Sequence, residues 1–538
     1  MSDDGDHAIT LNRLLDDRVA ERGDATALIY QDRAISFTAL AEQVRSVAAG
    51  LAALGIGPGD TVAVWLPNMP EWVVLEFALA RLGAVAVAIN TKFRKHEVED
   101  ILHRSAARLL VLSPQLGNVD YLSIVEQFDA ASLDALEAFL LVDDSVAERR
   151  ILGRKAYAYR ALTTHAAHEA DHGRSDSPCN VFTSSGTTSA PKLVLHRQSA
   201  ITHHALAVAA RFGYRDDADA VILGALPFCG VFGFDTIMGA LAAGRPVVLM
   251  PAFDAAAAVE QIERHRVTHA SGSDEMFRRI FMVAEPAARI ASLKEGAFAN
   301  FSADAAALVD SAQALGIKLF QTFGSSEVQA LMTYAPAGSG PGRWAVGGGT
   351  PSSDETRVRV RDTETGELLP DGESGELEIA GPNVMVEYMH NTEANARAVT
   401  ADGYVRTGDL GYIEGPDSFV YLARLGDTLR LGGFLVNPRE IEAYLEGFDA
   451  IALAQVVAVD TERGPRPVAF VILEAGAAFD EAAIIDACQA SMAKFKVPIR
   501  IQAIDAFPIT SSANGEKIQK AKLREQAQAL VDRQGALS

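Results

Sequence analysis

A run of hydroxyl residues that ends in proline and lysine is the segment with the clearest capacity for chemistry. It reads Phe182-Thr183-Ser184-Ser185-Gly186-Thr187-Thr188-Ser189-Ala190-Pro191-Lys192. Backbone N–H groups and side-chain hydroxyls around a glycine can converge on phosphate oxygens, and a lysine adds positive charge. It is not a Walker A loop, because Pro191 stands where that motif has glycine and Leu193 where it has serine or threonine. A flexible Ser/Thr loop is the alternative for the hydroxyl run alone; the proline–lysine ending and the motifs downstream favour a phosphate loop.

Together with three later segments, this run resembles the motifs of the adenylate-forming superfamily, which holds acyl-CoA synthetases, stand-alone adenylation domains and luciferases. That family's loop usually reads S/T-S-G-T-T-G-x-P-K-G, and here Ser189 and Leu193 replace two of its glycines. The later segments are Phe323-Gly324-Ser325-Ser326-Glu327, then Arg406-Thr407-Gly408-Asp409, then the arginine Arg424. Each segment alone could be a turn, a helix-start carboxylate or a surface ion pair. Their shared order along nearly the whole chain makes coincidence a poor explanation.

The resemblance implies a role for each of these residues at an ATP site. Phe323 would pack on adenine, Asp409 would bind the ribose hydroxyls, and Arg424 would contact ribose or phosphate. Glu327 would hold Mg²⁺ on the ATP phosphates, which suits the preference of a hard cation for carboxylate oxygen. The full set expected at ATP or AMP is Ser184, Ser185, Gly186, Thr187, Thr188, Lys192, Ser302, Ala303, Phe323, Gly324, Ser325, Ser326, Asp409 and Arg424. In this set Ser302 and Ala303 stand where the family often has G-G-A, which is a departure.

A lysine near the C-terminus would complete the catalytic set, which is Lys517, Glu327 and Thr187. The segment Ala513-Asn514-Gly515-Glu516-Lys517-Ile518-Gln519-Lys520 resembles the family's G-K-I-x-[KR], with Glu516 inserted. By that match Lys517 would hold the substrate carboxylate and the α-phosphate while they react. Lys520 is the alternative, and a solvated basic helix start is the other interpretation.

The family rotates its small C-terminal domain between two half-reactions, so a hinge and a thiol channel are also implied. The family's hinge position falls on Gly426, and glycine widens the φ/ψ range open to a pivot. Gly432 and Gly433 resemble the strand beside pantetheine, where glycines allow close approach of CoA.

The segment Leu226-Pro227-Phe228-Cys229-Gly230-Val231-Phe232-Gly233-Phe234 resembles the family's acid-binding segment. The expected acid pocket comprises Phe228, Gly230, Phe232 and Gly233, with Gly347 and Gly349 on the opposite side. Plain core packing is the alternative for each phenylalanine alone. We expect Asp235 to cap the following helix and not to bind an α-amine, which favours a hydrophobic acid without an amino group.

A group of histidines and a single cysteine could also have chemical roles, but the sequence supports these roles less well. His165, His168 and His172 would share one face of an expected helix, so they could bind zinc, but no catalytic step requires a metal there. Cys229 is more typical of a small buried hydrophobe than of a nucleophile.

The elements that must position these residues alternate in type along the first half of the chain. Helical spacing at 11–22, 39–54, 72–82 and 97–105 is interleaved with apolar runs at 27–30, 61–66, 84–89 and 109–112. This pattern predicts βαβ units and parallel sheets. The segment after about residue 345 reads as β-rich, and the last 110 or so residues as a small α+β unit. The predicted fold class is therefore α/β: a large N-terminal domain (1–425) of parallel-sheet αβ subdomains plus a β-rich subdomain, and a small mobile α+β C-terminal domain (426–538).

Composition excludes several classes of protein. The 538 residues carry 48 Lys+Arg against 70 Asp+Glu, a formal net charge of −22, which argues against nucleic acid or anionic membrane as partner. An apolar run long enough to span a membrane is not expected. Three scattered cysteines and an acidic start without a signal pattern favour a cytoplasmic protein.

The sequence thus predicts an AMP-forming acid–CoA ligase that uses ATP, CoA and Mg²⁺. An adenylating enzyme that loads an acyl carrier protein is the nearest alternative, and a non-catalytic acyl or nucleotide binder is a more distant one. The sequence leaves open whether the chain forms a homodimer, and it does not identify the substrate acid.

Overall fold

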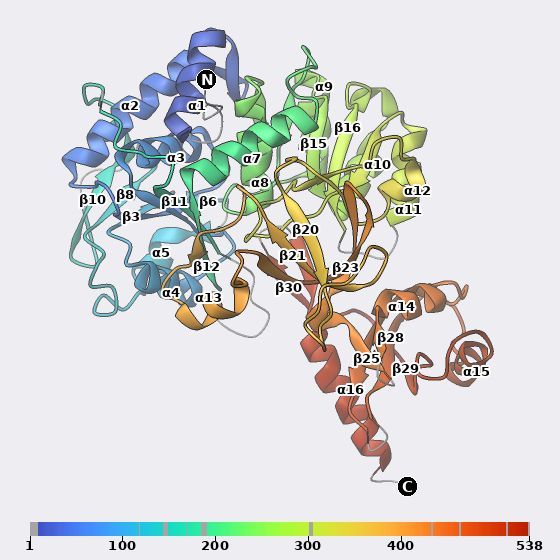
Figure 1. The fold of residues 1–538 in the computed structure, drawn as a ribbon. Coiled ribbons are helices and arrows are strands. Elements are labelled where there is room, and N and C mark those ends of the chain that lie inside the picture. Colours follow the sequence, from blue (N-terminus) through green and yellow to red (C-terminus); the bar gives the residue numbers. More distant parts are fainter. Residues whose placement is uncertain are drawn as a thin grey trace.

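The computed structural model describes residues 9–535 except 118, 144–148, 169, 184–190, 301–304, 432–433, 462–463 and 513–514. The chain forms two large sheets, a β-rich sheet and a small C-terminal unit, and the two large sheets exchange segments along the sequence (Figure 1). The predicted α/β class, with parallel sheets, a β-rich sheet and a small C-terminal unit, is confirmed, whereas the domain boundary at 425/426 and the mobility of the C-terminal unit stay predictions.

The first large sheet has the strand order β17-β16-β15-β13-β14-β1-β2. All neighbours pair in parallel except β1 and β2, which form a hairpin at one edge. The strands are β1 (Thr26–Tyr30), β2 (Arg33–Ser36), β13 (Ile222–Gly224), β14 (Val247–Leu249), β15 (His269–Ser273), β16 (Glu295–Ala299) and β17 (Lys318–Gln321).

The second large sheet has the order β22-β12-β11-β4-β3-β5-β8-β10-β9. Its centre is parallel, whereas β12 returns antiparallel to β11 and β22 pairs antiparallel to β12. The strands are β3 (Thr61–Trp65), β4 (Val85–Ala88), β5 (Leu109–Leu112), β8 (Ala138–Leu141), β9 (Arg149–Ile151), β10 (Arg154–Ala158), β11 (Pro178–Thr183), β12 (Leu193–Arg197) and β22 (Glu387–Tyr388). The predicted phosphate loop joins β11 to β12, and so leaves the sheet at the carboxyl end of a central strand.

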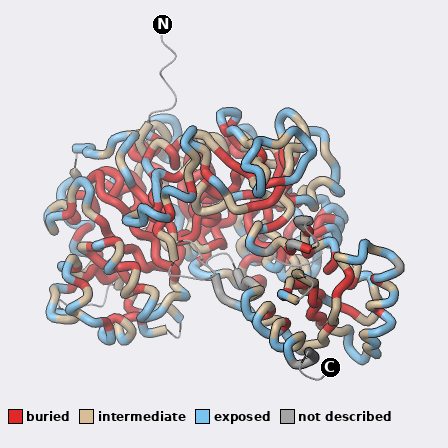
Figure 2. The backbone as a smooth tube through the Cα atoms, turned by 60° about the horizontal axis from the view of Figure 1, so that its bottom comes forward, coloured by how far each residue is buried: buried red, intermediate tan, exposed pale blue. Residues whose placement is uncertain are grey.

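Helices α3 (Pro70–Leu82) and α8 (Val231–Ala242) lie between the two large sheets. Pro70 at the first turn and Gly83, with φ 68°, at the end delimit α3. All residues of α8 and all but Glu71 of α3 are buried, which is expected where a helix is covered on both sides. Buried backbone fills the interior of the N-terminal part of the chain (Figure 2). The other helices of the N-terminal part are α1 (Leu11–Arg22), α2 (Phe37–Ala53), α4 (Lys95–Ser105), α5 (Tyr121–Val125), α6 (Tyr159–Leu162), α7 (Gln198–Arg211), α9 (Ala255–His265), α10 (Asp274–Val283), α11 (Ala305–Ala314), α12 (Pro341–Trp344) and α13 (Thr392–Ala398).

The β-rich sheet has the order β18-β19-β24-β23-β21-β20, and neighbouring strands in it pair antiparallel. Its strands are β18 (Thr333–Tyr334), β19 (Gly348–Pro351), β20 (Arg357–Arg361), β21 (Gly375–Ala380), β23 (Val405–Gly415) and β24 (Ser418–Arg424). A buried carboxylate, Glu378, lies between Arg359 and Arg361 on this sheet.

The C-terminal unit extends from the rest of the chain and has a core of its own (Figure 1). It follows a short 3₁₀ turn, η2 (Leu425–Asp427). Its elements are β25 (Leu429–Leu431), β26 (Phe434–Val436), α14 (Pro438–Glu446), β27 (Ile451–Val459), β28 (Arg466–Leu473), α15 (Glu481–Ser491), β29 (Arg500–Ala503), β30 (Ile509–Ser512), β31 (Gly515–Ile518) and α16 (Lys520–Gly535). In the described part of the chain, no helix is both long and apolar enough to cross a bilayer.

Candidate active site

The phosphate-loop residues Ser184, Ser185, Gly186, Thr187 and Thr188 lie outside the described residues. The strands on either side of them are well defined: Thr183 at the end of β11 pairs with Leu193 at the start of β12. Lys192, just before β12, places its Nζ 4.3 Å from the centre of the Tyr388 ring. The lysine is therefore held at the mouth of the β11–β12 hairpin.

The loop that carries Glu327 leaves β17 and passes the same edge of the second sheet. Glu327 accepts a hydrogen bond at Oε1 from the Tyr388 hydroxyl at 2.9 Å. Its backbone oxygen accepts from Met385 N at 2.8 Å. Thus one tyrosine brings together the predicted metal ligand and the predicted phosphate-loop lysine, which are far apart in the sequence.

Two features of this loop explain why it holds its shape. A Cβ at Gly324 would lie 2.5 Å from the backbone of Gln329 and Ala330, so no other residue fits. Gln329 and Leu331 adopt positive φ angles of 68° and 52° without being glycine. Such strained residues persist only where surrounding contacts fix them.

Buried histidines supply these contacts. His196 on β12 donates from Nε2 to Ser326 O at 2.7 Å, and its Nδ1 accepts from Gln329 Nε2 at 3.1 Å. His204 on α7 donates to Ala330 O at 2.6 Å. Burial lowers the pKa of both imidazoles to about 4, so each is neutral at pH 7 and has one N–H to donate.

Asp409 and Arg424 face each other across the β23–β24 pair. Arg424 Nε lies 3.1 Å from Asp409 Oδ1, and its Nη1 donates to Thr407 O at 3.0 Å. Asp409 is 2% exposed. Burial raises the pKa of Asp409 to about 6, although the Arg424 charge opposes that shift. This ion pair lies close enough to Glu327 for the Glu327 charge to contribute to the same shift.

Phe323 contributes mainly to packing in this conformation. Its ring is 6% exposed and lies 5.3 Å from Phe419 and 5.5 Å from Tyr421, measured between ring centroids. Gly324, Ser325 and Ser326 are more exposed than Phe323. The adenine-stacking role of Phe323 stays a prediction, as do the roles of Ser302 and Ala303, which lie outside the described residues.

The C-terminal lysines differ in their surroundings. Lys517 lies on β31, where its backbone pairs with Thr510 of β30; its side chain is outside the description. Lys520, the alternative, places Nζ 3.5 Å from Oε1 of the buried Glu442 within the C-terminal unit. Lys520 therefore forms an ion pair in this conformation, and the catalytic role of Lys517 stays a prediction.

Gly426 lies in the exposed turn η2, and nothing approaches the position of a Cβ there within 4 Å. Its carbonyl accepts a hydrogen bond from Arg524 Nη2 at 2.5 Å. No contact in this conformation therefore requires glycine, and the hinge role stays a prediction. Gly432 and Gly433 lie outside the described residues.

The expected acid-binding segment is a buried turn that leads into α8. Asn68 fixes this turn by accepting from Phe228 N at 2.9 Å and donating to Leu226 O at 2.8 Å. Phe228 and Phe232 are 1% and 4% exposed, and Gly230 is the N-cap residue of α8. A Cβ at Gly233 would lie 2.3 Å from Pro227 O, so this glycine is explained by packing.

The glycines expected on the opposite side are also explained by close packing. A Cβ at Gly347 would lie 2.9 Å from the Tyr421 ring, and one at Gly349 would lie 2.3 Å from Tyr334 O. The space that these glycines leave is filled by neighbouring protein atoms. Their part in an acid pocket stays a prediction.

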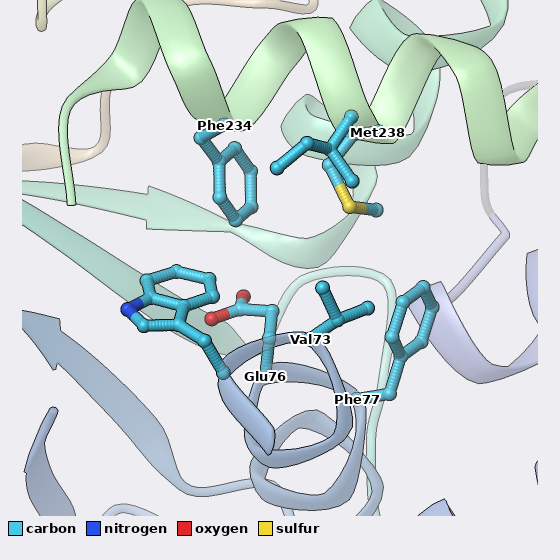
Figure 3. A pocket seen from close by; sticks show the side chains of 7 residues that line it. Val73, Glu76, Phe77, Phe234 and Met238 are labelled. Carbon is cyan, nitrogen blue, oxygen red and sulfur yellow. The ribbon is translucent and has the colours of Figure 1, made fainter. Parts of the chain in front are cut away.

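A small cavity lies between α3 and α8, next to the acid-binding segment (Figure 3). Apart from Glu76 its lining is apolar, and it comprises Trp72, Val73, Glu76, Phe77, Phe234, Ile237 and Met238. Its volume of about 10 Å³ is roughly the space that one water molecule needs. As shaped here it is too small for an acyl group.

Two expectations from the sequence are wrong. Asp235 does not cap a helix: α8 begins at Val231, so Asp235 lies inside it and instead accepts a hydrogen bond from Ala330 N at 2.7 Å. The segment 165–172 is not helical in its described residues, because α6 ends at Leu162. In this segment His172 N and His168 O bind Arg81, which fixes it along α3.

The structure supports neither a metal site at the histidine group nor a nucleophilic role for Cys229. Within the described residues, no three His, Cys, Asp or Glu side chains come together as a metal site would require. Cys229 is 3% exposed, and burial raises the pKa of its thiol to about 12, so it is no nucleophile at pH 7.

Sequence reasoning missed three residues that shape the site: Asn68, His196 and Tyr388. Each acts through contacts between segments far apart in the sequence. A histidine in the apolar strand directly after the phosphate loop was the one available signal, and it pointed to no specific partner.

The fold and the grouping of these residues are those expected of an enzyme that activates its substrate with a nucleotide. The chain matches the family described as AMP-binding enzyme over residues 15–389, and AMP-binding enzyme C-terminal domain over residues 440–514. The chain belongs to this AMP-binding enzyme family. It is an acid–thiol ligase of the AMP-forming kind, a class that uses ATP, CoA and Mg²⁺.

Curated relatives agree with this assignment along the whole chain. A Mycobacterium tuberculosis (strain ATCC 25618 / H37Rv) protein named 3-[(3aS,4S,7aS)-7a-methyl-1,5-dioxo-octahydro-1H-inden-4-yl]propanoyl:CoA ligase is 32% identical over 528 residues, covering 96% of this chain and 98% of the relative. A mitochondrial medium-chain acyl-CoA ligase from Danio rerio is 28% identical, covering 96% of this chain and 88% of the relative.

Solved structures share the fold. The anthranilate CoA ligase AuaEII in complex with anthranoyl-AMP has a TM-score of 0.82 at 23% identity, covering 99% of this chain and 100% of that chain. ATP-bound MatB from Rhodopseudomonas palustris has a TM-score of 0.83 at 23% identity, covering 97% and 100%.

Proposed function

We propose that the chain converts a hydrophobic carboxylic acid without an α-amino group to its acyl-AMP and then to its CoA thioester. The observation that carries the ATP half of this proposal is the cluster of Lys192, Tyr388 and Glu327, with the Asp409–Arg424 pair nearby. It supplies a cation for phosphate, a carboxylate for a metal and a carboxylate for a ribose diol.

Glu327 fits magnesium by the chemistry of its donor atoms. A hard divalent cation prefers carboxylate oxygens and retains several waters, and Glu327 is only partly buried, with one oxygen bonded to Tyr388. When bound there, magnesium would neutralise charge on the departing pyrophosphate.

The chain's own residues then act mainly by position and charge. The hydroxyls of 184–188 and Lys192 hold the phosphates, and Asp409 accepts hydrogen bonds from the ribose. Lys517 holds the acid's carboxylate oxygen and an α-phosphate oxygen while the carboxylate attacks phosphorus and pyrophosphate leaves. The C-terminal domain, 426–538, then turns about Gly426. The CoA thiol loses its proton to water and its sulfur attacks the acyl carbon, and the bond from that carbon to the AMP phosphate oxygen breaks, which releases AMP.

The choice of acid is supported by two observations. The carboxylate of Asp235 is buried and accepts from Ala330 N, so it is not placed to receive a substrate amine. Relatives of the chain include a ligase named for a bicyclic dioxo-propanoate, a medium-chain acyl-CoA ligase and a long-chain-fatty-acid–CoA ligase. Hydrophobic acids, alicyclic ones included, are therefore the class to test first.

The test is mass spectrometry of products from Mg·ATP and a pool of aliphatic, aromatic and alicyclic acids, with and without CoA. Acyl-CoA products are the expected result. Acyl-AMP that accumulates despite CoA would replace CoA with a carrier protein as the thiol partner. Absence of any adenylate across the pool would contradict the proposed acid class.

Lys517→Ala separates the half-reactions. We expect acyl-AMP formation to fall about 100-fold or more, because a charge that stabilises the reacting oxygens is lost, while acyl-AMP supplied directly still reacts with CoA. Lys522→Ala, on the following helix α16, is the control, and Lys520→Ala tests the alternative. If Lys517→Ala retains both half-reactions, the lysine is misassigned.

A further inference from the structure

Tyr388 occupies an unusual place among the ATP-site candidates. It lies on β22, a two-residue strand that pairs with β12 in the register Val194↔Tyr388 and Leu195↔Glu387. The same β12 strand begins directly after Lys192. The tyrosine is thereby fixed next to the exit of the phosphate loop by main-chain pairing.

A second contact fixes the tyrosine from the other side. Asn395 on α13 accepts from Tyr388 N at 2.7 Å through Oδ1 and donates from Nδ2 to Tyr388 O at 2.9 Å. One side chain thus clamps both backbone groups of Tyr388. The ring is 4% exposed, so it has little freedom to change rotamer.

The two functional ends of this side chain meet different ATP-site candidates. The hydroxyl donates to Glu327 Oε1 at 2.9 Å, and the ring face lies 4.3 Å from Lys192 Nζ. A tyrosine hydroxyl can donate a hydrogen bond, whereas a carboxylate can only accept one, so the geometry assigns Tyr388 as the donor. One side chain thus contacts a carboxylate through its hydroxyl and an ammonium through its ring face.

We propose that Tyr388 is a positioning residue for Mg·ATP: its hydroxyl sets the orientation of the Glu327 carboxylate, and its ring holds the Lys192 ammonium beside the phosphate loop. This inference rests on the proposed roles of Glu327 and Lys192. Because the two ends act on different groups, their effects separate experimentally. The hydroxyl acts through the metal ligand, and the ring acts through the phosphate-loop lysine.

The test compares Tyr388→Phe and Tyr388→Leu by calorimetric titration with ATP, once with excess Mg²⁺ and once with EDTA. Without the hydroxyl, Kd for Mg·ATP should rise about threefold to tenfold, since one hydrogen bond to a charged group is lost, and Kd for metal-free ATP should not change. Tyr388→Leu should weaken the binding of Mg·ATP and of metal-free ATP, because Lys192 also loses its aromatic contact.

The matched control is Tyr404→Leu. Tyr404 also makes a cation–π contact, because Arg359 Cζ of the β-rich sheet lies 3.7 Å from the centre of its ring. Tyr404→Leu should leave the Kd for Mg·ATP and the Kd for metal-free ATP unchanged. If Tyr388 only stabilises packing, its variants should have a lower melting temperature but the same ratio of the two Kd values as the parent.

Glu327→Gln distinguishes failure of this inference from failure of its premise. We expect Glu327→Gln to weaken Mg·ATP binding and Tyr388→Phe to add little in that background. If Glu327→Gln is impaired but Tyr388→Phe binds Mg·ATP like the parent, the positioning role is wrong and the metal assignment stands. If Glu327→Gln binds Mg·ATP normally, the metal assignment itself is wrong. Should Tyr388→Leu fail to fold, Tyr388→Phe alone decides.

Discussion

Two buried carboxyl groups, Glu76 between α3 and α8 and Asp409 at the β23–β24 pair, are each 2% exposed. Glu76 accepts one hydrogen bond, from Asn180 Nδ2 at 2.9 Å, and otherwise faces an apolar cavity (Figure 3). Asp409 faces the Arg424 guanidinium at 3.1 Å. Burial raises the pKa of Glu76 to about 8 and that of Asp409 to about 6.

The difference shows what a nearby cation does for an equally buried acid. An isolated carboxylate in an apolar interior is costly, so Glu76 avoids the cost by staying protonated at pH 7. Arg424 opposes the same penalty at Asp409, so that group is mostly ionised at pH 7 and can accept two hydrogen bonds. Burial alone therefore does not set the ionisation state of a carboxyl group, because a neighbouring cation shifts the group toward its charged form.

The largest predicted effect is on the pH dependence of stability, and it should come from Glu76→Gln. Glutamine keeps the shape of the protonated acid but cannot ionise. Between pH about 4.5 and 8, unfolded Glu76 loses its proton while folded Glu76 keeps it. The free energy of unfolding of the parent should thus fall by about 1.4 kcal/mol per pH unit across this window relative to Glu76→Gln, and level off above it.

Denaturant unfolding of both proteins at pH 5, 6, 7 and 8 measures this difference. Glu126→Gln, at an exposed position after α5, is the control and should run parallel to the parent. Parallel curves for the parent and Glu76→Gln would mean that Glu76 is not held neutral.

The next effect should be on nucleotide binding by Asp409→Asn. The amide loses the charge and one acceptor, so we expect AMP to bind about 30- to 100-fold more weakly at pH 8. Asp402→Asn, on an exposed aspartate paired with Arg359, is the matched control and should bind AMP normally. An Asp409→Asn variant with normal AMP affinity would remove Asp409 from the ribose site.

The sequence could predict the layered fold because its signals were local. The strand at 109–112 and the helix at 11–22 lie where the periodicity placed them, since alternating apolar runs and capped helices specify parallel sheets by themselves. The helix expected over 165–172 failed for the opposite reason. That segment has no apolar face of its own, and its backbone is fixed by Arg81 of α3.

The site was predictable only in part. Glu327, Asp409 and Arg424 stand in recognisable motifs, and the structure brings Asp409 and Arg424 into contact. Tyr388 and His196 could not be assigned, because their partners lie 61 and 130 residues away along the chain. Asp235 was misread for the same reason: its acceptor role depends on Ala330, which no local pattern around α8 reveals.

The smallest and most specific effect should come from Arg424→Gln, which makes Asp409 resemble Glu76. In the parent, Asp409 titrates near 6, so adenosine, which has no phosphate to titrate, should bind about tenfold more weakly at pH 5 than at pH 8. Because Arg424 lowers this pKa, its removal should move the midpoint of the binding profile to higher pH. At pH 5 both proteins should bind weakly, at pH 7 the variant should bind severalfold more weakly than the parent, and the gap should narrow again toward pH 9. If the midpoint of the binding profile stays near pH 6 in Arg424→Gln, burial alone sets the ionisation of Asp409. The difference in pKa between Asp409 and Glu76 would then come from how deeply each group is desolvated, and not from the Arg424 guanidinium.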